Sequence, residues 1–163
     1  MTLADRLIAR VTRRPPDFVI GGAERPYMLR WWVLPRNRFF NVYLHKFLRS
    51  DDDRAHHDHP WAFNASILLR GRYLEHTTRH GLPWCDERRA GDWKFRWGAA
   101  AHRIELLPAP YDWSSLNALA PCWTVFITGP KVREWGFLCE RGWVHWRDFT
   151  APGDKGSVGR GCE

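Results

Sequence analysis

The sequence predicts an all-β protein in which short antiparallel strands form one domain. Runs rich in aromatic and β-branched residues, among them "YMLRWWVL", "FFNVYLHKFL" and "CWTVFITG", recur about every ten residues between turn-forming residues. Helical periodicity is almost absent after residue 14, and strands at this spacing are typical of a sandwich or a barrel. The 163 residues show no break in composition, so we expect a single core.

Both ends of the chain differ from this pattern. Leu3, Leu7 and Ile8 lie at helical spacing with charged residues between them, which predicts a short amphipathic helix ended by two prolines and not a signal peptide. The segment after residue 150 is rich in glycine and lacks aromatic residues, so we expect a loosely held tail. We therefore divide the chain into a helical extension, a barrel-forming part and a flexible tail, at residues 1–16, 17–150 and 151–163.

The net charge of +7 comes from arginine far more than from lysine, with the basic residues scattered among acids. Such a distribution gives non-specific attraction to nucleic acid, and no recognised nucleic-acid-binding motif accompanies it. We therefore do not expect a nucleic-acid partner, although a basic nucleic-acid-binding protein is kept as an alternative. No apolar stretch is long enough to cross a bilayer, so no membrane partner is expected.

The four cysteines form no close pair and are too few for a disulfide scaffold. Reduced thiols are the better interpretation of Cys85, Cys122, Cys139 and Cys162. We therefore expect no disulfide and a cytoplasmic location.

A run of histidines and aspartates precedes one of the predicted strands. The stretch "DDDRAHHDHPWAFNASILLRG", residues 51–71, holds three histidines and four aspartates in its first nine positions. Because side chains alternate across a strand, we expect His57 and His59 to point inward on the apolar face. That face continues through Trp61, Phe63, Ala65, Ile67 and Leu69. Two inward histidines on one strand predict part of a metal site.

This stretch resembles the cupins, a family of small β-barrels whose first motif has the form G-x5-HxH-x4-E-x6-G. His57 and His59 are followed at the motif's spacing by Asn64 and Gly71. The second cupin motif, G-x5-PxG-x2-H-x3-N, is matched at two positions, Gly91 and His102. The resemblance implies a cupin-like antiparallel β-barrel, that is, a double-stranded β-helix or jelly roll, with the short N-terminal helix outside it. It also implies that His57, His59 and His102 bind one metal ion.

Other motif positions differ from the cupin pattern. Asp51 replaces the first glycine, and Trp97, Ala99 and Leu106 replace the remaining residues of the second motif. Asn64 stands where the metal-binding glutamate would be, and we keep it as a further candidate ligand. A site of three histidines without a carboxylate is similar to the thiol dioxygenase branch of the cupins. Three neutral imidazoles suit Fe(II), which the resemblance favours, and would also suit Zn(II), Ni(II) or Cu(II).

The resemblance implies an Fe(II)-dependent oxygenase that acts on a small anionic molecule, a thiol being one option. Thiol dioxygenases hold the substrate carboxylate with an arginine, and Arg72 is our candidate for that role; Tyr73 is the candidate for a phenol near the reacting oxygen. Cupins commonly pair through edge strands, so we expect a homodimer. No nucleophile triad or phosphate loop is present, which gives no support to a hydrolase or a kinase.

Two further alternatives stay open. His56 and Asp58 with a distant histidine would form the two-histidine, one-carboxylate triad of the 2-oxoglutarate oxygenases. A cupin-like protein could also bind a small molecule without catalysing a reaction. Four other histidines are expected to be packed, as for His45 and His145, or solvated, as for His76 and His80.

Overall fold

The structure is a computed structural model that describes residues 1–22, 24–51, 55–108, 119–153 and 157–163. Residues 52–54, which belong to the acidic run before the histidines, lie outside the described residues. Two helices are described, α1 (Leu3–Val11) and α2 (Trp146–Phe149). The strands are β1 Phe18–Ile20, β2 Met28–Trp32, β3 Asn41–Phe47, β4 His56–His57, β5 Phe63–Arg70, β6 Arg72–Arg79, β7 Leu82–Arg89, β8 Trp93–Trp97, β9 Arg103–Leu106, β10 Cys122–Thr128, β11 Gly136–Cys139 and β12 Gly142–His145.

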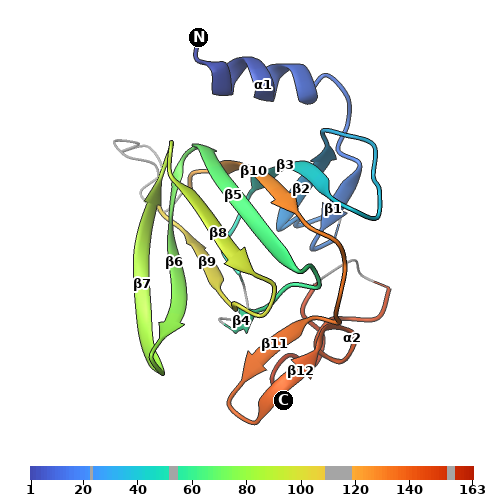
Figure 1. The fold of residues 1–163 in the computed structure, drawn as a ribbon, viewed down its shortest axis with the longest axis vertical. Helices are drawn as coiled ribbons and strands as arrows, with labels where there is room; N and C mark the ends of the chain where they lie inside the picture. Colours follow the sequence, from blue (N-terminus) through green and yellow to red (C-terminus); the bar gives the residue numbers. More distant parts are fainter. Residues whose placement is uncertain (23, 52–54, 109–118, 154–156) are drawn as a thin grey trace.

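The strands form three antiparallel sheets (Figure 1). The largest has six strands in the order β1-β2-β3-β10-β5-β8, and the two smaller ones have the orders β12-β11-β4 and β7-β6-β9. Sequence neighbours such as β4 and β5 lie in different sheets, so the chain crosses repeatedly from one sheet to another. The prediction of an all-β antiparallel fold is therefore confirmed.

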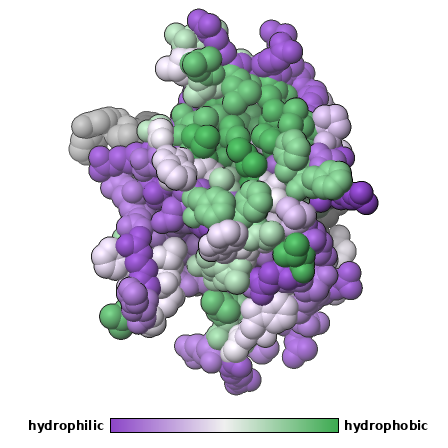
Figure 2. All heavy atoms as spheres, in the orientation of Figure 1, coloured by the Kyte–Doolittle hydropathy of each residue, from purple (hydrophilic) through white to green (hydrophobic). Residues whose placement is uncertain are grey.

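Helix α1 lies outside the sheets, as the sequence predicts (Figure 1). Thr2 and Asp5 form a reciprocal capping box that satisfies backbone N–H groups at the start of the helix. Ile8 is the buried residue of the helix and packs with Trp31 and Leu44 of the six-stranded sheet. Figure 2 shows a continuous hydrophobic area on this part of the molecule, whereas the face over β6 and β7 is mostly hydrophilic.

The main hydrophobic core fills one part of the space between the sheets. Its buried members come from strands of both the six-stranded and the β7-β6-β9 sheets: Met28, Phe47, Leu68, Tyr73, Ile104, Leu106 and Cys122. A separate cluster of Ala55, Phe137 and Phe149 connects β11 to α2. The remaining interior is lined by polar and charged side chains, which points to a site there.

Two segments differ from the predicted strand pattern. Strand β7 was not predicted, because its sequence "LPWCDERR" is polar and contains a proline; most of its residues are exposed at the edge of a sheet. The run "WVHWRDF" has the same aromatic and β-branched composition as the predicted strands, but it leaves β12 at His145 and continues as α2. His145 is the N-cap of that helix, and its ring accepts a hydrogen bond from the backbone N–H of Arg147.

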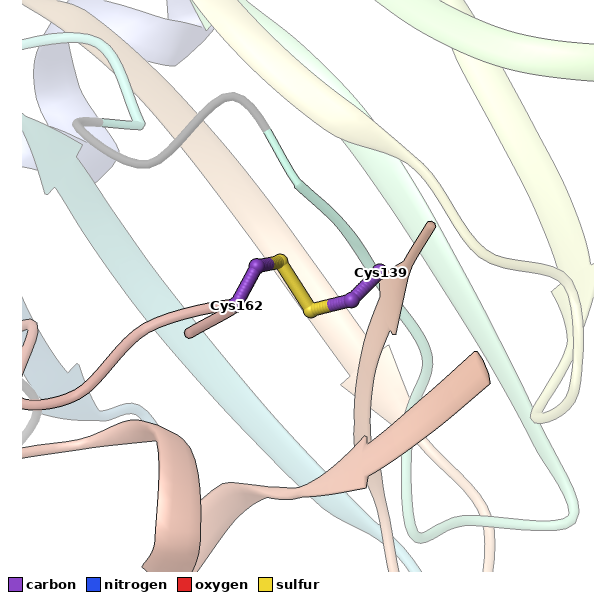
Figure 3. Close-up of a disulfide and its surroundings, with 2 residues drawn as sticks. All are labelled: Cys139 and Cys162. Carbon is purple, nitrogen blue, oxygen red and sulfur yellow. A yellow bond between two sulfur atoms is a disulfide. The ribbon is translucent and has the colours of Figure 1, made fainter. Parts of the chain in front are cut away.

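The prediction of four reduced cysteines is wrong. Cys139, at the end of β11, forms a disulfide with Cys162 of the C-terminal segment (Figure 3), and the two Cα atoms are 5.4 Å apart. The backbone N–H groups of Gly159 and Gly161 both donate to the carbonyl of Phe149, which attaches the same segment a second time. The sequence did not reveal the pair because the two cysteines are 23 residues apart and meet only through the fold.

Among the residues that the structure describes, no helix has the length and apolar character needed to span a membrane.

Candidate metal site

Backbone pairing brings His57 opposite His102. The two residues exchange N–H···O hydrogen bonds of 2.9 and 3.0 Å, an isolated antiparallel bridge. On its other side His57 pairs with Phe137 of β11. Directly opposed residues have neighbouring side chains, so the bridge itself sets the spacing of two of the three predicted ligands.

The third histidine is positioned by a close backbone approach. The N–H of His59 donates to the carbonyl of Gly98 at 2.9 Å, and Gly98 in turn donates to the carbonyl of Ala62. A Cβ atom on Gly98 would lie 1.9 Å from the carbonyl oxygen of Trp61, so only glycine fits at this position. Gly98 therefore holds the segment from His59 to Ala62 against the end of β8.

The three imidazoles converge on one point. The Nε2 atoms of His59 and His102 are 3.0 Å apart, and one ring nitrogen from each of His57, His59 and His102 lies within 4.8 Å of the others. Two nitrogens bound at a right angle to one ion with bonds of about 2.1 Å would be separated by about 3.0 Å. The spacing of the two Nε2 atoms thus fits ligands of a single cation.

A buried carboxylate lies behind His102. Glu75 of β6 has no exposed surface, and its Oε1 lies 2.9 Å from Nδ1 of His102, within hydrogen-bond distance although at an angle outside the usual range. Arg96 of β8 makes an ion pair with the same carboxylate oxygen. Burial acts to raise the pKa of Glu75, but the contacts with His102 and Arg96 outweigh it and lower the pKa to about 2. Glu75 is therefore ionised and can orient the His102 ring with Nε2 toward the site.

Two histidines of the site, His59 and His102, are neutral at pH 7 because their pKa values are lowered. Burial lowers the pKa of His102 to about 4, although the contact with Glu75 opposes this shift. Burial also lowers the pKa of His59 well below its ordinary value, and the other two histidines add to the effect. Neutral imidazoles offer lone pairs, so the donor set fits a divalent cation of the Fe(II) or Zn(II) type.

Aromatic rings surround the three histidines. Trp61 stacks on His59 at a centroid distance of 5.6 Å, and Phe126 of β10 lies 5.7 Å from the same ring. Phe137 and Trp135 lie 6.0 and 6.4 Å from His57. These rings limit the contact of the imidazoles with bulk water.

Comparisons with known proteins identify the fold. No protein-family model matches the chain, and no curated protein matches its sequence. A protein with a double-stranded β-helix domain from Klebsiella pneumoniae superposes with a TM-score of 0.50 and 15% identity over 84% of this chain and 95% of that one. Oxalate decarboxylase of Bacillus subtilis, described with Mn(II) centres, also gives 0.50 and 15%, over 79% of this chain and 31% of its own. Hydroxypropylphosphonic acid epoxidase from S. wedmorenis gives 0.47 and 13%, over 71% and 57%.

The chain has a double-stranded β-helix fold, which is the fold that the resemblance predicts. Within this fold the predicted trio of His57, His59 and His102 is brought together. Gly91, matched by the second motif, lies at the turn between β7 and β8 with a φ of 98°, a conformation that favours glycine.

The predicted alternation of side chains fails beyond Trp61. His57 and His59 lie together as predicted, but Pro60 separates β4 from β5 and the inward phase changes between them. On β5 the buried side chains are those of Asn64, Ser66 and Leu68, whereas Ile67 is 40% exposed. Phe63 therefore packs outside the barrel against Phe95 of β8 and not beside the histidines.

Asn64 is fully buried, and neither its Oδ1 nor its Nδ2 has a hydrogen-bond partner among the described residues. The neighbouring residue across β10, Thr128, also has a buried hydroxyl without a partner. An unpaired buried polar group costs about 1–3 kcal/mol, so this pair of orphaned groups is typical of an interior that holds water or a ligand. The role of Asn64 as a metal ligand stays a prediction.

The structure also locates the two predicted catalytic residues. Tyr73 is buried in the main core, and burial raises its pKa to about 12. Arg72 lies next to Tyr73 on β6, and its Nη1 is 3.6 Å from Oε1 of Glu87 on β7. Tyr73 and Glu75 share the inner face of β6, so alternation places Arg72 on the other face. Their predicted roles rest on the resemblance, whereas the contacts of the site involve Glu75 and Arg96.

The rival set of ligands is not assembled. Asp58 is buried, but its carboxylate accepts hydrogen bonds from the backbone of Gly136, from Arg133 and from Trp143. Through these contacts Asp58 attaches the end of β4 to the β11-β12 hairpin. Asp58 is thus a structural carboxylate, and the triad predicted for a 2-oxoglutarate oxygenase does not form around it.

The other histidines divide between the barrel interior and the surface. His45 of β3 is packed as predicted, with its ring stacked on Phe126 at 5.1 Å. His80 is exposed, as predicted, at the turn after β6. His76 is not solvated as predicted, because its ring is half-buried and its Nε2 lies 2.8 Å from Glu105.

Proposed function

We propose that this protein is an Fe(II)-dependent oxygenase that acts on a small anionic molecule, with a thiol as the first substrate class to test. The observation that supports the proposal is the convergence of His57, His59 and His102 in the barrel interior, with the Glu75 carboxylate behind His102. A divalent ion held by three neutral ligands keeps its full double charge and leaves coordination positions for small molecules.

The protein's own residues have three tasks in this proposal. The three imidazoles hold the ion through lone pairs, and Glu75 fixes the orientation of the His102 ring. Trp61 and Phe126 cover His59 and reduce the access of water to the reacting groups. Asn64, with both amide atoms unpaired, is available to a ligand in the interior.

Oxygen consumption tests the proposal. Metal-free protein would be loaded anaerobically with Fe(II), and in parallel with Mn(II) or Zn(II), and assayed against thiols, amino acids, diketones and 2-oxoglutarate. We expect uptake with Fe(II) and one substrate class, lost on chelation and in His102→Ala but retained in His76→Ala. Uptake that requires 2-oxoglutarate would move the protein to the rival class. Metal binding without any uptake would instead support a non-catalytic cupin that binds a small molecule.

The homodimer and the cytoplasmic location stay predictions from the sequence.

A further inference from the structure

Arg30 of β2 is a cation inside the barrel with no acidic partner among the described residues. It lies directly across from His45 in the β2–β3 pairing, and its Nε–H donates to Nε2 of His45 at 2.9 Å. Its guanidinium carbon lies 4.9 Å from the centroid of the Tyr43 ring. Arg96, the other interior arginine of this region, differs because Glu75 neutralises it. Within the described ranges no carboxylate makes an ion pair with Arg30.

A short chain of aromatic contacts joins Arg30 to the three histidines. His45 stacks on Phe126 at 5.1 Å, and Phe126 lies 5.7 Å from His59. Arg30 and His45 are directly paired across β2 and β3, so their side chains share one face of the sheet. Arg30 therefore faces the same interior as the candidate metal site.

The guanidinium has donors left for a ligand. His45 occupies Nε–H, whereas Nη1 and Nη2 have no hydrogen-bond partner among the described residues, and neither atom is sealed from solvent. Burial lowers the pKa of Arg30 to about 10, so the group is still charged at neutral pH. Two adjacent Nη groups match the two oxygens of a carboxylate, which they can bind with parallel hydrogen bonds.

We propose that Arg30, positioned by His45 and Tyr43, binds the carboxylate of the substrate while the other end of the substrate faces His57, His59 and His102. The orientation toward the histidines rests on the proposed function, but the carboxylate site itself does not require a metal. His45 and Phe126 link Arg30 to His59 through successive contacts, and this short path favours a small carboxylic acid as the substrate. Arg30, and not Arg72, is the arginine that selects for an anion.

Binding to the metal-free protein tests this proposal separately from any oxygenase activity. The probes are propionate and propionamide, which have similar shape but differ in charge, and the measurement is an NMR titration of labelled protein. We expect wild type to prefer propionate by at least about tenfold, because charge-assisted hydrogen bonds are lost with the amide. Arg30→Gln should remove this preference, and Arg30→Lys should keep part of it. Arg38→Gln, which removes an exposed arginine, should match wild type.

Three outcomes would overturn the proposal. These are equal affinity of wild type for the two probes, an unchanged preference in Arg30→Gln, and a loss of preference in Arg72→Gln in place of Arg30→Gln. Thermal unfolding of each variant shows whether it is folded. Should Arg30→Gln not fold, Arg30→Lys decides, and full wild-type affinity for propionate in that variant would reject the bidentate site. A protein that binds propionate through Arg30 but consumes no oxygen would refute the proposed function alone.

Discussion

The Nδ1 atom of His102 lies 2.9 Å from Oε1 of Glu75, a carboxylate with no exposed surface on β6, the strand that pairs with β9 just after His102. Arg96 makes an ion pair with the same oxygen, so the carboxylate connects β8 to a candidate metal ligand. A carboxylate at this distance favours the proton on Nδ1 and leaves Nε2 as the metal-binding atom. This relationship makes Glu75 a positioning residue for the site.

Replacing Glu75 should weaken metal binding without removing a ligand. In Glu75→Gln we expect the affinity for Zn(II) or Fe(II) to fall by about 10–100-fold, the usual effect of removing a partner behind a ligating histidine. Arg96 would also lose its buried counter-charge, so the metal-free variant should be destabilised by up to about 3–5 kcal/mol. Competition with a chromophoric chelator gives the affinity, and denaturant unfolding gives the stability.

A matched control for Glu75 is Glu105→Gln, because Glu105 contacts His76 and not the site. If Glu105→Gln weakens metal binding as much as Glu75→Gln does, the effect is not specific to the carboxylate behind His102.

Removal of any one of the three histidines should abolish stoichiometric metal binding. Elemental analysis of His57→Ala, His59→Ala and His102→Ala should give less than about a tenth of the wild-type content, because two neutral imidazoles form an incomplete site. His76→Ala is the control, since His76 contacts Glu105. Equal metal content in the wild type and the three variants would contradict the site.

The sequence was sufficient for the parts of the site that follow local rules. The spacing of His57 and His59 places both on one face of an extended segment, and the second motif supplied His102. The outcome changes at Pro60, where the chain leaves one sheet and enters another, so an alternation counted through the proline gave the wrong face for Phe63. Periodicity holds only within one strand.

Contacts between distant strands could not be derived in the same way. Glu75 had one available signal, namely a charged residue on the same face as Tyr73 of a predicted strand, but its partner Arg96 depends on how β6 and β8 face each other. Arg30 was one of many scattered arginines, and only the paired register of β2 and β3 shows that it lies across from His45, where no described carboxylate makes an ion pair with it. The positions of residues along the chain do not show which distant strands will pair or face each other.

The metal-free protein should lose stability as the pH falls below about 6.5. The folded-state pKa values of His59 and His102 are lowered, the latter to about 4, whereas an unfolded histidine titrates near 6.5. Between these values the unfolded chain binds protons that the folded chain does not, so acid favours unfolding. Well below pH 6.5, but still above its folded-state pKa, each histidine contributes a slope of about 1.4 kcal/mol per pH unit.

Denaturant unfolding of the metal-free protein at pH 7.5, 6.5 and 5.5 measures this dependence. A variant with His59→Asn and His102→Asn should show a shallower profile, because two of the groups that bind protons only in the unfolded chain are gone. His45 and His56, whose pKa values burial also lowers, should account for the dependence that is left. Glu75, with a folded pKa of about 2, adds to the loss only below its ordinary value near 4.5. A wild-type stability that stays constant from pH 7.5 to 5.5 would show that the two imidazoles are not buried as described.

The disulfide between Cys139 and Cys162 should contribute measurably to stability. It closes a loop with a sequence separation of 23. A crosslink of that length lowers the conformational entropy of the unfolded chain, which stabilises the folded state by about 3 kcal/mol. Cys139→Ser and Cys162→Ser should each lower the free energy of unfolding by about that amount, and a reductant should lower that of wild type equally. Cys85→Ser is the control, because Cys85 is exposed and unpaired.

Since Cys139 ends the strand whose Phe137 pairs with His57, the serine variants should also bind metal more weakly than wild type when measured under native conditions. A reductant effect of the same size in wild type and in Cys139→Ser would mean that the loss of stability does not come from this bond.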